Sequence, residues 1–284
     1  MRKGRGGWGR TGGRWSRRPS SGRSNPLMRS RGPSWRARLA PPTDRQCRMA
    51  VMSGDDATEA DAGQFADLVR TRRSVRAFLD TDVSRAQIQA ILDMARHAPS
   101  GGNMQPWNVH VLGRQTIGEL GDAIRTALAE PDYVETGDYR YYPARPVAPY
   151  GDRIRQAGHD LYEALGIGRR DVAARREQKL KNFDFFGAPA GLLVTIDARL
   201  ERGSWIDVGL FLNTLSLAIV SQGLGCCLQA SFSSHGDAVR RVLGLERDAL
   251  VVCGVAVGHA DETHPVNRQP LRRQDVAEFV RFHP

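Results

Sequence analysis

The chain contains the sequence Arg72-Arg73-Ser74-Val75-Arg76-Ala77-Phe78, which follows a short segment with a helical pattern. This stretch places three guanidinium groups and one hydroxyl within five residues. Guanidinium groups bind phosphate through paired hydrogen bonds, and a serine hydroxyl adds a neutral hydrogen bond. The stretch is therefore a candidate phosphate-binding segment, although a solvated basic turn would have the same composition.

Two further stretches combine small residues with hydrogen-bonding side chains. The first is Ala98-Pro99-Ser100-Gly101-Gly102-Asn103-Met104-Gln105-Pro106-Trp107. Its small residues would let a planar ligand approach the backbone, and its polar side chains offer hydrogen bonds. Taken alone, it also fits a plain connection with Trp107 in the core. The second is Gly223-Leu224-Gly225-Cys226-Cys227-Leu228-Gln229-Ala230-Ser231, where a buried helix ends, a short strand follows and polar residues stand at its edge.

The hydrophobic pattern predicts one α+β domain of helices packed on a sheet from about Gln64 onward. Ser84-Arg85-Ala86-Gln87 is a capping box that opens a helix. Residues 131–149 are rich in Pro and Tyr, which predicts irregular structure. The other predicted helices are Thr116–Ala129, 151–165, 170–183 and Ile206–Ser221, and the predicted strands are Val109–Leu112, Gly191–Ile196, Cys226–Ala230 and Leu250–Val257.

The positive charge of the chain is concentrated at its N-terminus. Residues 1–50 hold fourteen of the 41 Lys and Arg but a single acid, Asp44, whereas the net charge of the whole chain is +10. This segment has no apolar periodicity, so residues 1–52 are predicted to be a disordered basic tail and 53–284 the folded domain. Translation starting at Met49 or Met52 would explain the tail, and so would an RNA-binding segment of the arginine/glycine-rich kind. Nucleic-acid binding is disfavoured because the remainder of the chain is nearly neutral.

The cysteines and the apolar runs predict a reduced, cytoplasmic protein without a membrane span. The four cysteines form no CxxC pair, and the adjacent Cys226 and Cys227 are a poor start for a disulfide framework. No uninterrupted apolar run reaches the roughly 18–20 residues of a membrane helix. No metal site is predicted, because the spacing of His259, Asp261, Glu262 and His264 fits no standard ligand set.

In their order and spacing, the three stretches resemble the nitroreductase family, over roughly residues 64–284. Further matches are Asn182–Pro189, Trp205–Gly209 and Pro265–Leu271, which look most like the branch that reduces nitrobenzoate and other nitroaromatics. The resemblance implies a nitroreductase fold with a mixed central sheet flanked by helices. It also implies an intertwined homodimer with two flavin mononucleotide (FMN) sites at its interface.

The resemblance also assigns roles along the candidate flavin site. Arg72, Arg73 and Ser74 match residues that hold the FMN phosphate and ribityl chain, and Arg76 matches a basic residue near the pyrimidine edge. The loop at 98–107 matches one that reaches the flavin across the dimer interface. Its matching residues are Pro99, Ser100, Gly101, Asn103 and Gln105, and the residues matching a stretch at the N5 edge are Leu228, Gln229, Ala230 and Ser231.

The C-terminal part of the site departs from the family pattern. Arg268 matches a second phosphate ligand, but Val266 stands where relatives often have another basic residue. Arg272 or Arg273 could compensate for that difference. Some relatives also bring an Asn and a Lys to the pyrimidine edge from a later helix, and the sequence does not place these two.

The implied reaction is a ping-pong reduction in which NADH or NADPH reduces FMN and then leaves. A nitroaromatic or quinone then takes its place and accepts two electrons, so no acid–base catalyst is required of the protein. The segment near 131–187 is the expected substrate lid. Its candidate lining residues are Tyr133, Tyr139, Tyr141, Tyr142 and Phe183–Phe186, the last of which fit the core equally well. The alternatives are another flavin reaction on the same fold, such as dehalogenation, oxidation or flavin degradation, and non-catalytic flavin binding or redox sensing.

Overall fold

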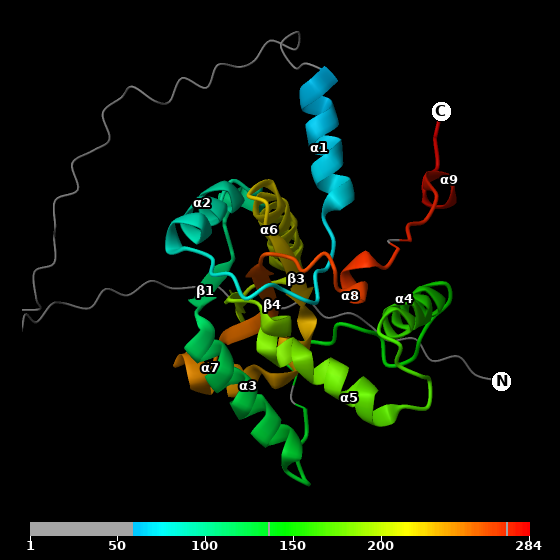
Figure 1. The fold of residues 1–284 in the computed structure, drawn as a ribbon. Coiled ribbons are helices and arrows are strands. Elements are labelled where there is room, and N and C mark those ends of the chain that lie inside the picture. Colours follow the sequence, from blue (N-terminus) through cyan, green and yellow to red (C-terminus); the bar gives the residue numbers. More distant parts are fainter. Residues whose placement is uncertain (1–58, 136, 271) are drawn as a thin grey trace, which may run out of the picture. The chain divides into compact units, whose positions relative to one another are not determined.

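The computed structural model describes residues 59–135, 137–270 and 272–284 (Figure 1). The predicted basic tail at 1–52 lies outside the described residues. The helices are α1 (Glu59–Thr71), α2 (Arg85–Ala95), α3 (Arg114–Ala129), α4 (Tyr150–Ala164), α5 (Val172–Leu180), α6 (Arg202–Ser221), α7 (Gly236–Leu243), α8 (Pro265–Arg268) and α9 (Val276–Phe279). The strands are β1 (Asn108–Leu112), β2 (Ala190–Asp197), β3 (Gly225–Gln229) and β4 (Ala249–Gly258), and three 3₁₀ turns are η1 (Gly101–Asn103), η2 (Lys181–Gly187) and η3 (Ala230–His235).

The four strands form one sheet in the order β1-β2-β4-β3, and each neighbouring pair is antiparallel. A parallel pairing is present as an isolated bridge between Ser74 and Cys226, beside the edge strand β3. The parallel part of the expected mixed sheet is therefore limited, within the described residues, to this one contact. This bridge matters for function because it joins the candidate phosphate-binding segment to the sheet.

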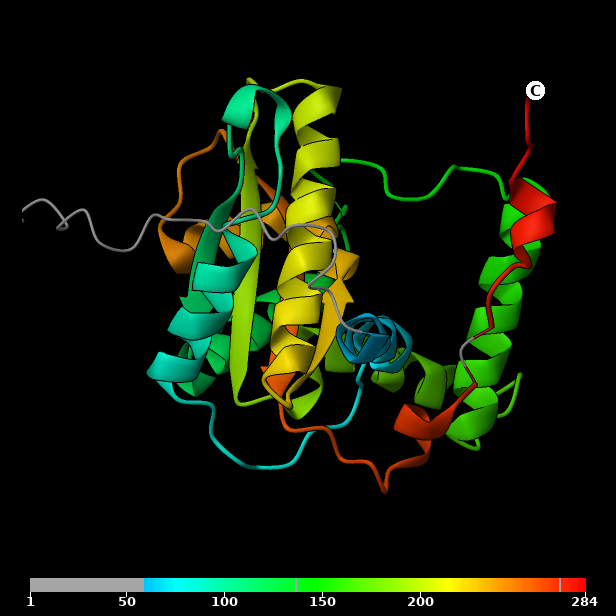
Figure 2. The same cartoon turned by 90° about the horizontal axis from the view of Figure 1, so that it is seen from above.

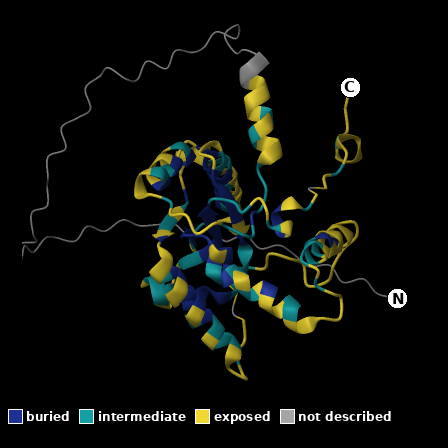
Figure 3. Ribbon diagram, viewed as in Figure 1, coloured by how far each residue is buried: buried dark blue, intermediate teal, exposed yellow. Residues whose placement is uncertain are grey.

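Two apolar clusters cover opposite faces of this sheet, which explains the nearly unbroken apolar sequence of β2. Leu192 and Val194 of β2 point into a cluster with α2 and α6, whereas Leu193 points into a cluster with α3 and α7. Side chains of a strand alternate between its faces, so a strand buried on both faces needs apolar residues at consecutive positions. Figure 2 shows α2 and α6 against one face of the sheet, and Figure 3 shows the buried residues concentrated in the strands and the inner helix faces.

Helix α6 is long and apolar enough to cross a membrane by length and composition, which its interrupted apolar run did not indicate. Within the described residues it is the one helix that meets those criteria. Its inner face nevertheless packs in the core, where Phe211, Leu215 and Ile219 are almost fully buried. On its outer face Ile206 and Leu210 are 68% and 42% exposed. The helix therefore has the place of a core helix with one uncovered apolar stripe.

Candidate functional site

The segment Arg72–Phe78 runs in extended form along the edge of the sheet. The Val75 amide donates to the Cys226 carbonyl at 2.9 Å, and the Leu79 amide donates to the His259 carbonyl at 2.9 Å. A glycine at 225 allows this approach, because a Cβ there would lie 2.7 Å from Cγ2 of Val75. The backbone of the segment is thus fixed at both ends, and its polar side chains are held at defined positions.

The segment lines a cavity of about 590 Å³, called here the arginine pocket. Its other walls come from α4 and from C-terminal residues within 266–270 and 272–278. Arg72, Ser74 and Arg76 line this pocket, and among the described residues neither arginine has a carboxylate partner. Arg76 Nη1 donates to the Ser74 carbonyl at 3.4 Å. Guanidinium groups without carboxylate partners, beside a hydroxyl, have the chemistry that an anion site requires.

Arg73 has a different role from its neighbours. Its guanidinium donates to the carbonyls of Asn267 and Gln269, and it is therefore largely occupied by backbone. Asn267 is buried and completes the attachment, since its Oδ1 accepts from the Arg76 amide at 2.8 Å and its Nδ2 donates to the Ala77 carbonyl at 2.8 Å. Arg73 and Asn267 thus hold the C-terminal segment against the arginine pocket. Sequence reasoning did not single out Asn267, whose one signal was its place in the matched stretch Pro265–Leu271.

A second cavity has a volume of about 900 Å³, and Arg76 lines both this cavity and the arginine pocket. We call this second cavity the ring pocket. Its lining includes the end of β3 and the start of η3, with Leu228, Gln229, Ala230 and Ser231. Within the described part of the chain, the buried Gln229 Oε1 and Ser231 Oγ have no hydrogen-bond partner. Buried polar atoms without partners are costly, so their presence marks a place for a polar ligand.

Lys179 and Asn182 also line the ring pocket, and the sequence did not place either of them. Gln229 Nε2 donates to the Asn182 carbonyl at 2.7 Å, which brings the end of α5 and the start of η2 to the end of β3. These two residues have the types that the family resemblance implied for the pyrimidine edge. The one sequence feature that could have indicated Asn182 was its position at the start of the matched stretch Asn182–Pro189.

The loop Pro99–Gln105 does not line either pocket. It lies at the start of α6, where the Gly101 amide donates to Asp207 Oδ2 at 3.2 Å and the Gln105 amide donates to Ser100 Oγ at 3.0 Å. Asn103 and Gln105 have positive φ values of 55° and 51°. Residues other than glycine seldom adopt that conformation, so the loop is held in an unusual shape by these bonds. One chain alone does not bring Pro99, Ser100, Gly101, Asn103 and Gln105 to Arg72.

Arg268 does not line the arginine pocket. It lines a third cavity, of about 890 Å³, and its Nε donates to the Glu262 carbonyl at 2.6 Å. Val266 is buried, with 1% of its surface exposed. Of the two proposed substitutes, Arg272 is paired with Asp160 and Arg273 lines the arginine pocket without a carboxylate partner among the described residues.

The aromatic residues divide between the pocket and the core. Tyr139, Tyr141 and Tyr142 line the ring pocket, and Tyr139 Oη donates to the Val252 carbonyl at 2.8 Å. Burial raises the pKa of Tyr139 to about 12, so its hydroxyl stays protonated. Phe183, Phe185 and Phe186 are instead buried in the core cluster with α3 and α7.

The described cysteines are buried, free thiols. Burial raises the pKa of Cys226 and of Cys253 to about 12, and it also raises the pKa of Cys227. A thiol that stays protonated is a poor nucleophile, so these residues serve as core side chains rather than as redox groups.

Comparison with known proteins assigns the chain to a family. A family model described as the nitroreductase family matches residues 69–259. The chain is 38% identical over 218 residues to 4-nitrobenzoate reductase of Pseudomonas putida, covering 77% of this chain and 95% of the relative. It is 33% identical over 235 residues to nitroreductase NfnB of Mycolicibacterium smegmatis, covering 82% and 99%.

A solved structure has the same fold. The FMN and NADPH-dependent nitroreductase NfnB from sphigopyxis sp. strain HMH aligns with a TM-score of 0.75 and 36% identity, over 77% of this chain and 98% of that one. The expected α+β nitroreductase fold is therefore confirmed. Since the family model spans more than half of the chain and these relatives match nearly end to end, the chain belongs to the nitroreductase family.

Proposed function

We propose that the chain is an FMN-dependent oxidoreductase that uses NADPH or NADH to reduce nitroaromatic compounds. The observation that carries this proposal is that Arg76 lines both the arginine pocket and the ring pocket. One end offers unpaired guanidinium groups for a phosphate, and the other offers unpartnered buried polar atoms for a heterocycle. The relatives named as nitrobenzoate and nitrobenzene reductases support the same reaction.

The residues present fit FMN. Arg72 and Ser74 would hold its phosphate, while Ser231 Oγ and Gln229 Oε1 would satisfy polar atoms of the ring system. Arg76 would place a positive charge beside the pyrimidine edge, which favours two-electron reduction, and Lys179 could add a second charge there. When bound, FMN supplies the hydride chemistry, and the protein supplies position, charge and exclusion of water.

The decisive test is anaerobic reduction of the FMN-loaded protein. NADPH or NADH should bleach the flavin absorbance, and a nitroaromatic added afterwards should restore it. A protein that binds FMN but is reduced by neither nucleotide would be a flavin carrier or sensor, and the reductase proposal would be wrong. Restoration of the absorbance by a halogenated aromatic but by no nitroaromatic or quinone would favour the dehalogenase alternative.

We further propose that the protein is a homodimer, in which the loop Pro99–Gln105 of one subunit completes the pockets of the other. The support is the uncovered apolar stripe of α6, together with the finding that the loop does not line the arginine pocket or the ring pocket of its own chain. Replacing Leu210 by Asp should shift the protein from dimer to monomer and reduce FMN retention, because a charge cannot be buried without a partner. Sedimentation velocity would show the change. Val172→Asp, at an apolar position on α5 that is 74% exposed against 42% for Leu210, should leave the dimer intact.

The acceptor is proposed to lie over the ring pocket, beneath a lid formed by part of residues 131–187. The exposed Arg140 stands between Tyr139 and Tyr141 in the pocket wall and has no carboxylate partner among the described residues. Arg140→Gln should raise KM for 4-nitrobenzoate about 3- to 10-fold, because a charge-assisted bond to the carboxylate is lost near the solvent. KM for nitrobenzene should change less than about twofold on the same reasoning. Arg145→Gln, outside the pocket, is the control, and equal effects on both substrates would contradict the role of Arg140.

The remaining proposals concern the chain as a whole. We propose that residues 53–284 form the enzyme, that it acts in the cytoplasm, and that residues 1–52 are dispensable for catalysis. The full-length protein and one starting at Met52 should then have equal kcat/KM and equal RNA affinity. Weaker RNA binding by the shorter protein would instead give the tail a function of its own.

A further inference from the structure

Arg76 lies where its segment changes from one backbone partner to another. At Ser74 the segment forms a parallel bridge with Cys226 of β3, and at Phe78 it forms an antiparallel bridge with Ala260. The Arg76 amide falls between these two bridges and donates to a side chain instead of a strand. A backbone amide without an acceptor is costly in a partly buried segment, so the residue that supplies this acceptor determines the path of the chain at Arg76.

The acceptor is the side chain of Asn267, which is 5% exposed. Its Oδ1 accepts from the Arg76 amide at 2.8 Å. Its Nδ2 donates to the Ala77 carbonyl at 2.8 Å and to the Asp261 carbonyl at 2.9 Å. A carboxamide carries a donor and an acceptor on one planar group, as a peptide bond does. The Asn267 side chain therefore takes the place of a peptide group of a neighbouring strand, and it bonds two consecutive residues of the segment.

This attachment determines where a positive charge stands. Arg76 lines both the arginine pocket and the ring pocket, and its Nη1 donates to the Ser74 carbonyl at 3.4 Å. The energy between two charges falls as they separate. A shift of the Arg76 backbone would therefore weaken the influence of its guanidinium on a group held in the ring pocket, even though the side chain itself is unchanged.

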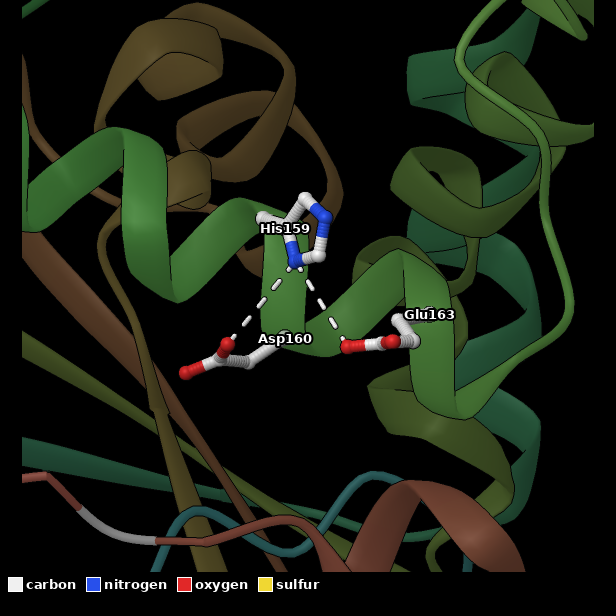
Figure 4. A group of neighbouring side chains, drawn as sticks. All are labelled: His159, Asp160 and Glu163. Carbon is white, nitrogen blue, oxygen red and sulfur yellow. Dashed lines mark ion pairs between the residues drawn. The ribbon is translucent and has the colours of Figure 1, made fainter.

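The C-terminal segment has a second attachment, which does not involve Arg76. Arg272 Nε donates to Asp160 Oδ2 at 2.9 Å, and Asp160 lies on α4. Asp160 also belongs to a group of possible metal ligands with His159 and Glu163 (Figure 4). Both of its carboxylate oxygens already accept hydrogen bonds from side chains, so it serves the attachment and not a metal ion. Of these two attachments, the one at Arg272 makes no contact with Arg76, and it therefore provides a comparison.

We propose that Asn267 is a positioning residue for the redox reaction, and that it acts by holding the Arg76 guanidinium beside the ring pocket. The inference rests on the proposed use of FMN, whose ring system is the expected occupant of that pocket. A positive charge there favours the two-electron-reduced flavin, which carries more negative charge than the oxidised form. Asn267 does not line the ring pocket, and it thus raises the reduction potential of the flavin through Arg76.

The first test measures the backbone in the absence of flavin. Amide hydrogen exchange of the flavin-free, full-length chain, followed by mass spectrometry, reports the protection of residues 75–77. Asn267→Ala should make the Arg76 amide exchange about 10-fold faster, because this amide loses its acceptor. Asp160→Asn removes the other attachment of the C-terminal segment and should change this exchange less than about twofold. Unchanged protection of Arg76 in Asn267→Ala would overturn the proposal.

The second test measures the reduction potential of bound FMN by equilibration with a reference dye. Asn267→Ala should lower the ratio of reduced to oxidised flavin at a given potential about 5- to 10-fold, which is a shift of about −20 to −30 mV for a two-electron couple. Arg76→Gln should shift it in the same direction, because the charge itself is removed. Adding Asn267→Ala to Arg76→Gln should change the ratio less than about twofold further, since the two residues act as one unit. Asn108→Ala, at an exposed position outside both pockets, is the control.

Two results for the potential would overturn the proposal. An equal further shift in the Arg76→Gln background would show that Asn267 does not act through the Arg76 charge. Faster exchange at Arg76 with an unchanged potential would show that the attachment serves stability alone. Thermal unfolding would identify a variant that fails to fold, in which case Asn267→Ser, which retains a smaller polar group, gives both comparisons.

Failure of the proposed function would have a different result. A wild-type chain that binds no FMN would refute that function, and the role of Asn267 in the redox reaction with it. The exchange experiment needs no flavin, so it would still show whether Asn267 holds Arg76.

Discussion

Replacing Arg72 by alanine should weaken FMN binding by about 10- to 100-fold, the largest effect expected at the site. Hydrogen bonds to charged groups contribute about 1.5–3 kcal/mol, which corresponds to roughly this range of affinity. Arg72 is half-buried, lines the arginine pocket and has no carboxylate partner in the described chain, so its guanidinium is available to a phosphate. Fluorescence titration with FMN and with riboflavin measures the effect.

The control for Arg72 is its neighbour Arg70, which pairs with Asp67 on the exposed surface of α1. Arg70→Ala should leave FMN affinity unchanged within about twofold, because exposed ion pairs contribute little. Ser74→Ala should produce a smaller loss than Arg72→Ala, since the serine offers a neutral hydrogen bond. Retention of FMN with unchanged affinity by Arg72→Ala would place the phosphate outside the arginine pocket.

The largest effect on stability is expected from Asp138→Ala, which should lower the free energy of unfolding by about 3–5 kcal/mol. Asp138 and Arg240 form an ion pair at 2.8 Å whose side chains are 7% and 12% exposed. Asp138 Oδ2 also accepts from the Val251 amide at 2.7 Å. Removing the carboxylate would leave the Val251 amide unpaired and would leave the mostly buried Arg240 with Asp237, 66% exposed, as its remaining carboxylate partner. Urea unfolding monitored by circular dichroism would show the loss.

This prediction also concerns the acceptor site, because Asp138 directly precedes Tyr139 and Arg140. Its bonds to α7 and β4 fix the chain where it enters the wall of the ring pocket. Asp152→Asn is the control, since Asp152 is in an exposed pair with Arg155 and its loss should cost about 0–1 kcal/mol. Equal stabilities of the two variants would mean that the Asp138 pair contributes no more than a surface pair.

The sequence by itself determined the longer helices and the strands, and the family resemblance of its three stretches implied the cofactor chemistry. The capping box at Ser84 has both of its hydrogen bonds, and the apolar run at 190–197 is a strand buried on both faces. These features depend on neighbours a few residues apart, which share a helix face or alternate across a strand. The grouping of Arg72, Ser74 and Arg76 was visible for the same reason, because one extended segment carries all three.

Tertiary structure decided which of these residues are free to bind a ligand and which distant segments of the chain contact them. Arg72 and Arg73 are adjacent and chemically identical, yet Arg73 is engaged by the carbonyls of residues almost 200 positions away. Phe183–Phe186 could have lined a pocket, but the sheet order β1-β2-β4-β3 places three of these four residues in the core.

The same holds for the residues that the sequence did not place. Lys179 and Asn182 reach the ring pocket because η2 meets the end of β3, and Arg153 reaches the arginine pocket because Asp160 of α4 pairs with Arg272 of the C-terminal segment. Contacts between segments far apart in the chain depend on strand order and on the paths of the connections. A single sequence shows the local conformational preferences of each segment. The site, however, forms only when particular distant segments pack against one another.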